Sequence, residues 1–121
     1  MKTASDLERQ GLEAKYHEIL DFDKREIDNP DKYHPTRLYY LGRITKVIQL
    51  IRREFPDPSG IKIGDFASAQ GNIGLILAEM GHKVFVIDIN PTFIEYSKMK
   101  YERGKVEYIV ANIEDLEFLR I

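Results

Sequence analysis

The chain has 121 residues, 43% of them hydrophobic, and a formal net charge of −2. It is long enough to fold with a hydrophobic core, and its charge gives no general attraction to nucleic acid. It has no cysteine, which excludes disulfides, thiolate metal ligands and a cysteine nucleophile, and it shows no membrane span or signal peptide, so a cytoplasmic protein is expected.

Residues 1–58 are predicted to form a helical segment ahead of the sheet. A first helix is expected over residues 3–22, with Thr3 or Ser5 as its cap. A polar connector over residues 23–34 follows it. We interpret this helix as cover for the sheet.

A second helix is expected to begin near Pro35 and to end before Pro56. Its apolar residues recur at alternating spacings of three and four, which is typical of an amphipathic helix: Leu41, Ile44, Ile48, Ile51 and Phe55. It is also interpreted as cover for the sheet.

Residues 59–121 are predicted to contain the first half of a Rossmann-like cofactor-binding domain with a parallel sheet. The segment 61–90 reads as strand, small-residue turn, helix, strand and acid. The successive parts are the strand at 61–66, the turn Ala67–Gly71, a helix from Ile73 ended by Gly81, and the apolar strand Val84–Ile87 before Asp88.

The remaining elements continue the α/β alternation. Asn90 and Pro91 predict a helix start, and the helix is expected to run to about Arg103, with Gly104 ending it. Phe93, Tyr96 and Met99 share one face of that helix, although lysines interrupt the pattern. A third strand is predicted over residues 106–111.

The turn and Asp88 together predict a nucleoside site. Small residues let a ligand approach the backbone, and the N–H groups at the start of the next helix face it. Asp88 would then accept hydrogen bonds from a ribose diol. Spacing alone also permits a dinucleotide fingerprint at Ala69–Gly74, because Asp88 lies 19 residues after Ala69. Asp65 argues against it, since that strand position would be apolar and buried, where an unpaired carboxylate is costly.

The segments Asp65–Gly71, Leu77–Gly81 and Val84–Asn90 resemble the first motifs of class I S-adenosylmethionine-dependent methyltransferases. The chain departs from that pattern at Ala67 and Ala69, where the family has glycine. Alanine is expected to be tolerated there only if neither position needs a positive φ.

Two further segments extend the resemblance. His34–Leu41 is similar to the Pro-x-Arg-Leu segment of ubiquinone-biosynthesis O-methyltransferases, and Asn112–Phe118 is similar to the family's segment after the third strand. The resemblance implies that the cofactor is S-adenosyl-L-methionine and that Arg37 reaches its carboxylate. The implied cofactor-binding residues are Arg37, Ala67, Ser68, Ala69, Gly71, Asp88, Ile89, Asn112 and Ile113.

The resemblance implies a methyltransferase that acts on a small-molecule acceptor, with no metal and no predicted catalytic residue in this chain. Because only three strands are predicted, we expect an incomplete fold. The chain is then a truncation, which is the favoured reading, a chain that pairs with another chain, or one that self-associates through the exposed edge of its first strand. Two alternatives stay open, a non-catalytic cofactor-binding or regulatory module and a less favoured NAD-dependent oxidoreductase.

The three histidines do not form a metal site. His17, His34 and His82 have no metal-ligand spacing and are interpreted as surface histidines.

Overall fold

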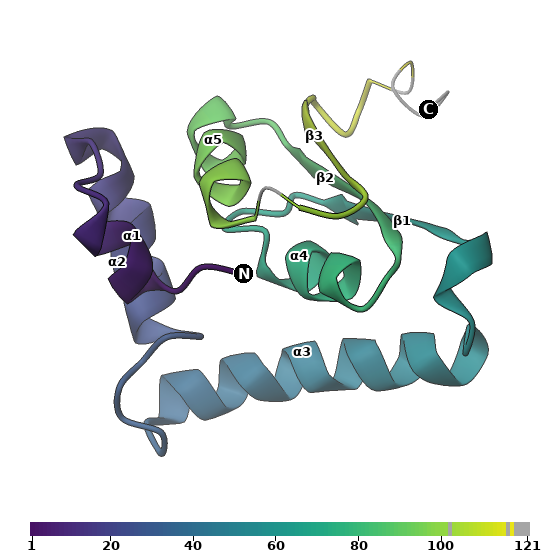
Figure 1. Ribbon diagram of the computed structural model, residues 1–121, viewed down its shortest axis with the longest axis horizontal. Helices are drawn as coiled ribbons and strands as arrows, with labels where there is room; N and C mark the ends of the chain where they lie inside the picture. Colours follow the sequence, from purple (N-terminus) through teal and green to yellow (C-terminus); the bar gives the residue numbers. More distant parts are fainter. Residues whose placement is uncertain (102, 116, 118–121) are drawn as a thin grey trace. The chain divides into compact units, whose positions relative to one another are not determined.

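The structure is a computed structural model that describes residues 1–101, 103–115 and 117 (Figure 1). The chain divides into two compact units, residues 2–57 and residues 58–121 together with Met1. Among the described residues, no helix combines the length and apolar character needed to cross a membrane.

The first unit is helical. It contains α1 (Ala4–Arg9), the 3₁₀ turn η1 (Ala14–Tyr16), α2 (His17–Arg25) and α3 (Pro35–Glu54). Helices α1 and α2 contact each other, and Leu7 and Leu20 are buried on them.

The single helix predicted over residues 3–22 is wrong, because the chain breaks between α1 and α2. Gly11 has φ 68°, a left-handed conformation that an α-helix cannot continue. The predicted cap is confirmed. The Thr3 side chain accepts from the Asp6 N–H, and the Asp6 side chain accepts from the Thr3 N–H.

Helix α3 begins at Pro35 as predicted and is followed by Phe55 at its C-cap. His34 caps its start, because the Nδ1 of His34 accepts from the Thr36 N–H at 3.2 Å. Of the predicted apolar stripe, only Ile44 is buried, and Phe55 is exposed. The role of these helices as cover for the sheet stays a prediction.

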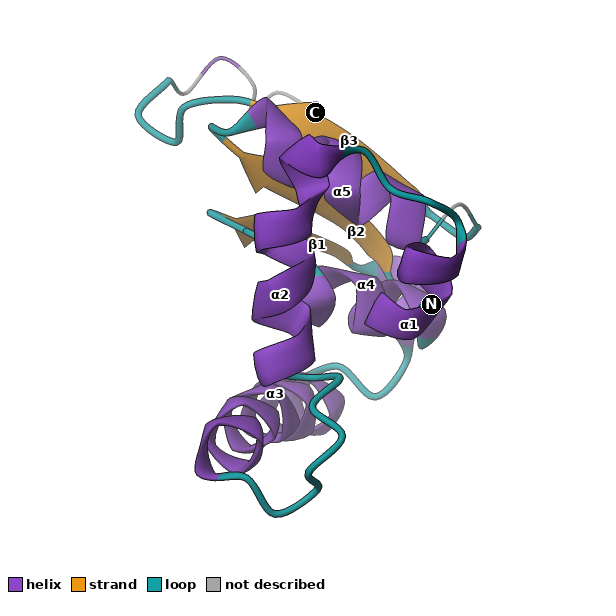
Figure 2. Ribbon diagram, turned by 90° about the vertical axis from the view of Figure 1, so that its left-hand side faces the viewer, coloured by secondary structure: helices purple, strands orange, loops and turns teal. Residues whose placement is uncertain are grey.

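The second unit is a Rossmann-like α/β structure, which confirms the predicted fold class. Three parallel strands pair in the order β1-β2-β3, joined by two helices. The elements are η2 (Pro58–Gly60), β1 (Lys62–Phe66), α4 (Asn72–Glu79), β2 (Lys83–Asp88), α5 (Pro91–Lys100) and β3 (Val106–Val110). Because both connections are right-handed crossovers in one direction, α4 and α5 lie on the same side of the sheet (Figure 2).

Strand β2 is the centre of this unit. Every β2 residue after Lys83 is buried, as the continuous apolar run predicts. The register places Phe66 opposite Ile87 and Val110 opposite Asp88, so the carboxyl ends of the three strands meet at one edge. Among the described residues, β1 pairs only with β2, and self-association through its other edge stays a prediction.

Helices α4 and α5 begin where the sequence predicts, although their ends and buried faces differ in part from the prediction. Gly81, with φ 102°, ends α4, and the Asn90 side chain caps α5 by accepting from the Thr92 N–H at 2.9 Å. Helix α5 ends at Lys100 rather than Arg103, because Tyr101 is extended. Its buried residues are Ile94, Tyr96, Ser97 and Lys100, so Tyr96 of the predicted face is buried, whereas Phe93 and Met99 are half-buried.

Candidate functional site

The turn between β1 and α4 contains two strained alanines. Ala67 has φ 54° and Ala69 has φ 49°, both in the left-handed region. This conformation costs about 1–2 kcal/mol for a residue with a Cβ. The expectation that alanine is tolerated only without positive φ is therefore wrong, since the turn keeps the positive φ and accepts the strain.

Hydrogen bonds of Asp88, the last residue of β2, connect this turn to the end of the strand. Its Oδ2 accepts from the Ala69 N–H at 2.9 Å, and its Oδ1 accepts from the Asn90 N–H at 2.8 Å. The Ser68 N–H also donates to the Ile87 carbonyl at 3.0 Å. The structure thus brings the predicted acid and the predicted turn into direct contact. Each carboxylate oxygen keeps further acceptor capacity for a ligand.

Helix α5 supports the same turn from a second side. Ser97 Oγ donates to the Ala69 carbonyl at 3.3 Å, and Lys100 Nζ donates to the Gln70 carbonyl at 3.2 Å and to the Asn72 side chain. Gly71 is required beside them. It has φ 78°, and a Cβ there would lie 2.6 Å from Ser97 Oγ.

Sequence reasoning missed Ser97 and Lys100. Lysine on a helix normally faces solvent, yet Lys100 is only 2% exposed and its Nζ lies 5.3 Å from the centre of the Tyr96 ring. The available signal was spacing, because Lys100 follows Ser97 by three residues and Tyr96 by four, which places all of them on one face.

Asp65 is a second carboxylate near the turn. Its Oδ2 accepts from the Gly74 N–H at 3.0 Å, and a Cβ at Gly74 would come within 2.9 Å of that oxygen. Burial raises the pKa of Asp65, the Gly74 N–H opposes this, and the nearby charge of Asp88 adds to the rise in pKa. The Asp65 carboxylate therefore has a hydrogen-bond partner, the Gly74 N–H, and is not the unpaired buried carboxylate that would be costly at this strand position.

Two polar side-chain atoms of the turn are buried without a hydrogen-bond partner, Ser68 Oγ and Gln70 Nε2. Buried polar atoms normally have partners, and an unsatisfied one costs about 1–3 kcal/mol. Both atoms therefore have hydrogen-bonding capacity that the structure leaves unused.

Exposed apolar residues follow the ends of β2 and β3. Ile89 is 64% exposed directly after β2, and Ile113 is 52% exposed shortly after β3. The Ala111 N–H donates to the Asp88 carbonyl at 3.1 Å, which ties the two segments together. Asn112 Oδ1 accepts from the Glu114 N–H at 3.0 Å and can accept a second hydrogen bond. Within the predicted segment 112–118, Leu116 and Phe118 lie outside the described residues.

Arg37 lies in the helical unit, on the first turn of α3. Its Nη1 donates to the Lys32 carbonyl at 3.1 Å, and its Nε is buried without a partner. The predicted contact of Arg37 with a cofactor carboxylate stays a prediction.

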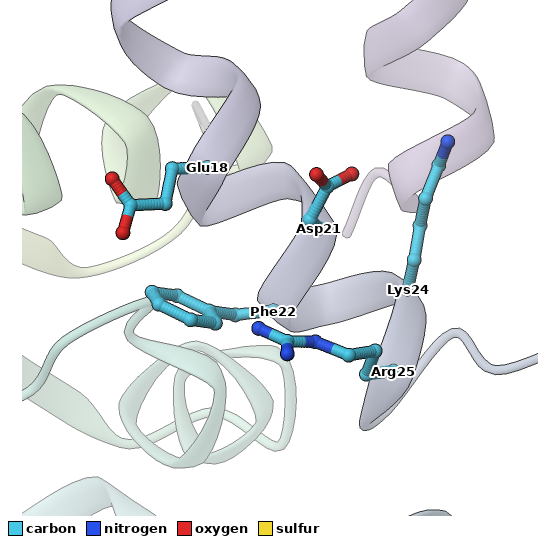
Figure 3. A pocket seen from close by; sticks show the side chains of 5 residues that line it. All are labelled: Glu18, Asp21, Phe22, Lys24 and Arg25. Carbon is cyan, nitrogen blue, oxygen red and sulfur yellow. The ribbon is translucent and has the colours of Figure 1, made fainter.

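Two other features lie outside this site. His82 is 2% exposed, so its assignment as a surface histidine is wrong, while His17 and His34 are exposed. A surface hollow of about 460 Å³ is lined by residues of α2 alone and includes no part of the turn after β1 (Figure 3): Glu18, Asp21, Phe22, Lys24 and Arg25.

The comparisons with known proteins bear on the sheet unit. Residues 64–120 match the family model described as a methyltransferase domain. No curated protein matches the chain. A solved TehB-like SAM-dependent methyltransferase from Corynebacterium glutamicum ATCC 13032 Kitasato is similar at 24% identity over 60% of this chain, with a TM-score of 0.42. The chain spans 46% of that protein's chain. The segment 64–120, just under half of the chain, is therefore similar to the methyltransferase-domain family.

Proposed function

We propose that this chain supplies the S-adenosylmethionine-binding part of a methyltransferase. The observation that carries the proposal is the Asp88 carboxylate, which is fixed at the end of β2 by the N–H groups of Ala69 and Asn90. A carboxylate held in this way has its orientation set before a ligand arrives, which lowers the entropic cost of binding.

The proposed contacts of Asp88 are with the ribose hydroxyls. Hydrogen bonds to a charged acceptor contribute about 1.5–3 kcal/mol each. The turn Ala67–Gly71 would lie against the same ligand through its backbone, and the buried Ser68 Oγ and Gln70 Nε2 are the polar atoms that fit this contact. Both atoms are covered in the free protein, so a polar ligand would reach them only after a local shift of the turn, and it would then satisfy them.

The other ends of the cofactor have proposed partners as well. Ile89 and Ile113 offer exposed apolar surface beside Asp88 for the adenine ring, and Asn112 offers an amide at the same edge. Arg37 is proposed for the methionine carboxylate, because a guanidinium forms paired hydrogen bonds with a carboxylate. This last assignment requires α3 to bring Arg37 to the turn.

The bound cofactor would supply a sulfonium methyl group, which a lone pair of the acceptor attacks while the S–C electron pair stays on sulfur. The residues of this chain bind and orient, and orientation is the main demand of such a transfer. We propose a small-molecule acceptor and assign no proton-transfer residue.

Calorimetric titration with S-adenosylhomocysteine and with NAD tests the proposal. We expect heat from the first ligand only. Asp88→Asn should weaken its binding by about tenfold or more, with the circular dichroism spectrum retained. Asp21→Asn, an exposed aspartate on α2, is the matched control and should bind as the wild type does.

The possible outcomes separate the candidates. Heat from NAD alone would replace the proposal with an oxidoreductase, and heat from neither ligand would remove the nucleoside site. Binding without methyl transfer to small phenols would favour the non-catalytic module, an alternative that the strained Ala67 and Ala69 keep open.

A further inference from the structure

We propose that Lys100 is a positioning residue that holds the ligand-binding turn in shape where glycine is missing. The inference rests on the proposed function for its effect on ligand affinity, although its structural part can be tested without any ligand. Lys100 lies on α5, 30 residues after the Gln70 carbonyl that accepts from its Nζ.

The turn needs such support because its own residues do not favour its conformation. Ala67 and Ala69 are both left-handed, and a strained backbone persists only where the surrounding structure fixes it. Glycine at either position would adopt the same φ with no steric cost. The contacts around the turn therefore supply what its residues lack.

Those contacts surround the strained residue Ala69. Its N–H donates to Asp88, its carbonyl accepts from Ser97 Oγ, and the next carbonyl, that of Gln70, accepts from Lys100. Lys100 also donates to the side chain of Asn72, the first residue of α4. One ammonium group thus joins the end of the turn to the start of the helix, which fixes the direction of the N–H groups between them.

Burial makes these contacts strong. Lys100 is 2% exposed and Ser97 is fully buried, so water does not compete for the two carbonyls. Rearranging the turn would also break the hydrogen bonds of Lys100 Nζ to the Gln70 carbonyl and the Asn72 side chain, which is costly for buried polar groups.

A double-mutant cycle tests the proposal. Lys100→Met keeps the aliphatic stem and removes the donors, and Lys98→Met, an exposed lysine of the same helix, is the matched control. Amide hydrogen exchange of Ala69 and Gly71 is measured in the unliganded protein against the amides of β2, and S-adenosylhomocysteine affinity is measured by calorimetry.

Lys100→Met should speed exchange at the turn by about tenfold more than at β2 and weaken ligand binding by about tenfold. Lys98→Met should change neither. In the Ala69→Gly background most of the Lys100→Met effect should disappear, because glycine adopts the turn's φ without support. A residue that only stabilises the whole unit would show no such dependence on Ala69.

Three results would overturn the proposal: equal acceleration at the turn and at β2, an equal Lys100→Met effect in both backgrounds, or no effect. If Lys100→Met does not fold, Ser97→Ala removes one donor to the same turn and should show the same cycle with Ala69→Gly. If the wild type does not bind S-adenosylhomocysteine, the proposed function fails while the exchange measurements still decide the role of Lys100.

Discussion

Replacing Ala67 with glycine should stabilise the protein, although glycine normally destabilises. Ala67 has φ 54°, and its side chain is exposed, so removing the methyl group loses little buried contact. The left-handed conformation costs alanine about 1–2 kcal/mol. Glycine avoids that cost but loses about 0.5–1 kcal/mol more backbone entropy on folding. The difference is a net gain of about 0 to 1.5 kcal/mol, with a central value of about 0.5–1 kcal/mol.

Urea unfolding followed by circular dichroism measures this gain directly. Within a domain of this size, it corresponds to a rise of about 2–4 °C in the melting temperature. The matched control is Ala111→Gly, an alanine next to β3 that is not left-handed. It should lose about 0.5–1 kcal/mol, the ordinary penalty of glycine.

The sign of the Ala67→Gly effect decides the reasoning. If Ala67→Gly lowers the free energy of unfolding as much as Ala111→Gly does, residue 67 does not adopt a left-handed conformation in solution. The turn would then carry no strain at residue 67 and would need less support from α5.

Three further substitutions probe the same site. Because burial raises the pKa of Asp65 above its ordinary value of 3.8, folded stability falls as pH rises from 3.8 through the raised pKa. Asp65→Asn should therefore gain stability relative to the wild type across that interval in urea titrations, and a pH-independent difference would contradict the shift. Gly71→Ala should lose about 2 kcal/mol or more, because its Cβ would meet Ser97 at a positive φ, whereas Gly60→Ala, with open space around its Cβ, should change little. Asp88→Asn should lose about 1–3 kcal/mol even without ligand, because the amide nitrogen replaces an acceptor of a backbone N–H, and unchanged unfolding by urea would refute that bonding.

The order of elements in the sheet unit could be predicted from the sequence because each has a local signal. The short, mostly β-branched run Val84–Ile87 favours a strand buried on both faces, and Asn90–Pro91 combines a cap with a favourable first-turn residue. Parallel pairing then requires that the turn after β1 and Asp88 lie at the same edge, which is what the structure shows.

The missed features depend on contacts between distant residues. Alanine usually avoids a positive φ, so Ala67 and Ala69 do not themselves indicate one, and only the glycines of the resembling family at these positions point to it. The acceptors of Lys100 lie 28 and 30 residues away, so spacing within α5 can place Lys100 on the face of Ser97 and Tyr96 but cannot identify those acceptors. The break at Gly11 is different, since a glycine inside a predicted helix is a visible signal that the hydrophobic spacing outweighed.

The same carboxylate serves the turn and the proposed ligand, which affects how binding data must be interpreted. Asp88 holds the strained Ala69 through its N–H, so a substitution at Asp88 perturbs the turn as well as the ribose contact. In the Ala69→Gly background the turn needs less support. The loss of ligand affinity on Asp88→Asn should therefore be smaller there, because only the loss of the direct contact between residue 88 and the ligand remains. An equal loss in both backgrounds would mean that Asp88 contributes to affinity only through the ligand. The alanines in place of glycine therefore make the shape of this turn depend on the residues around it.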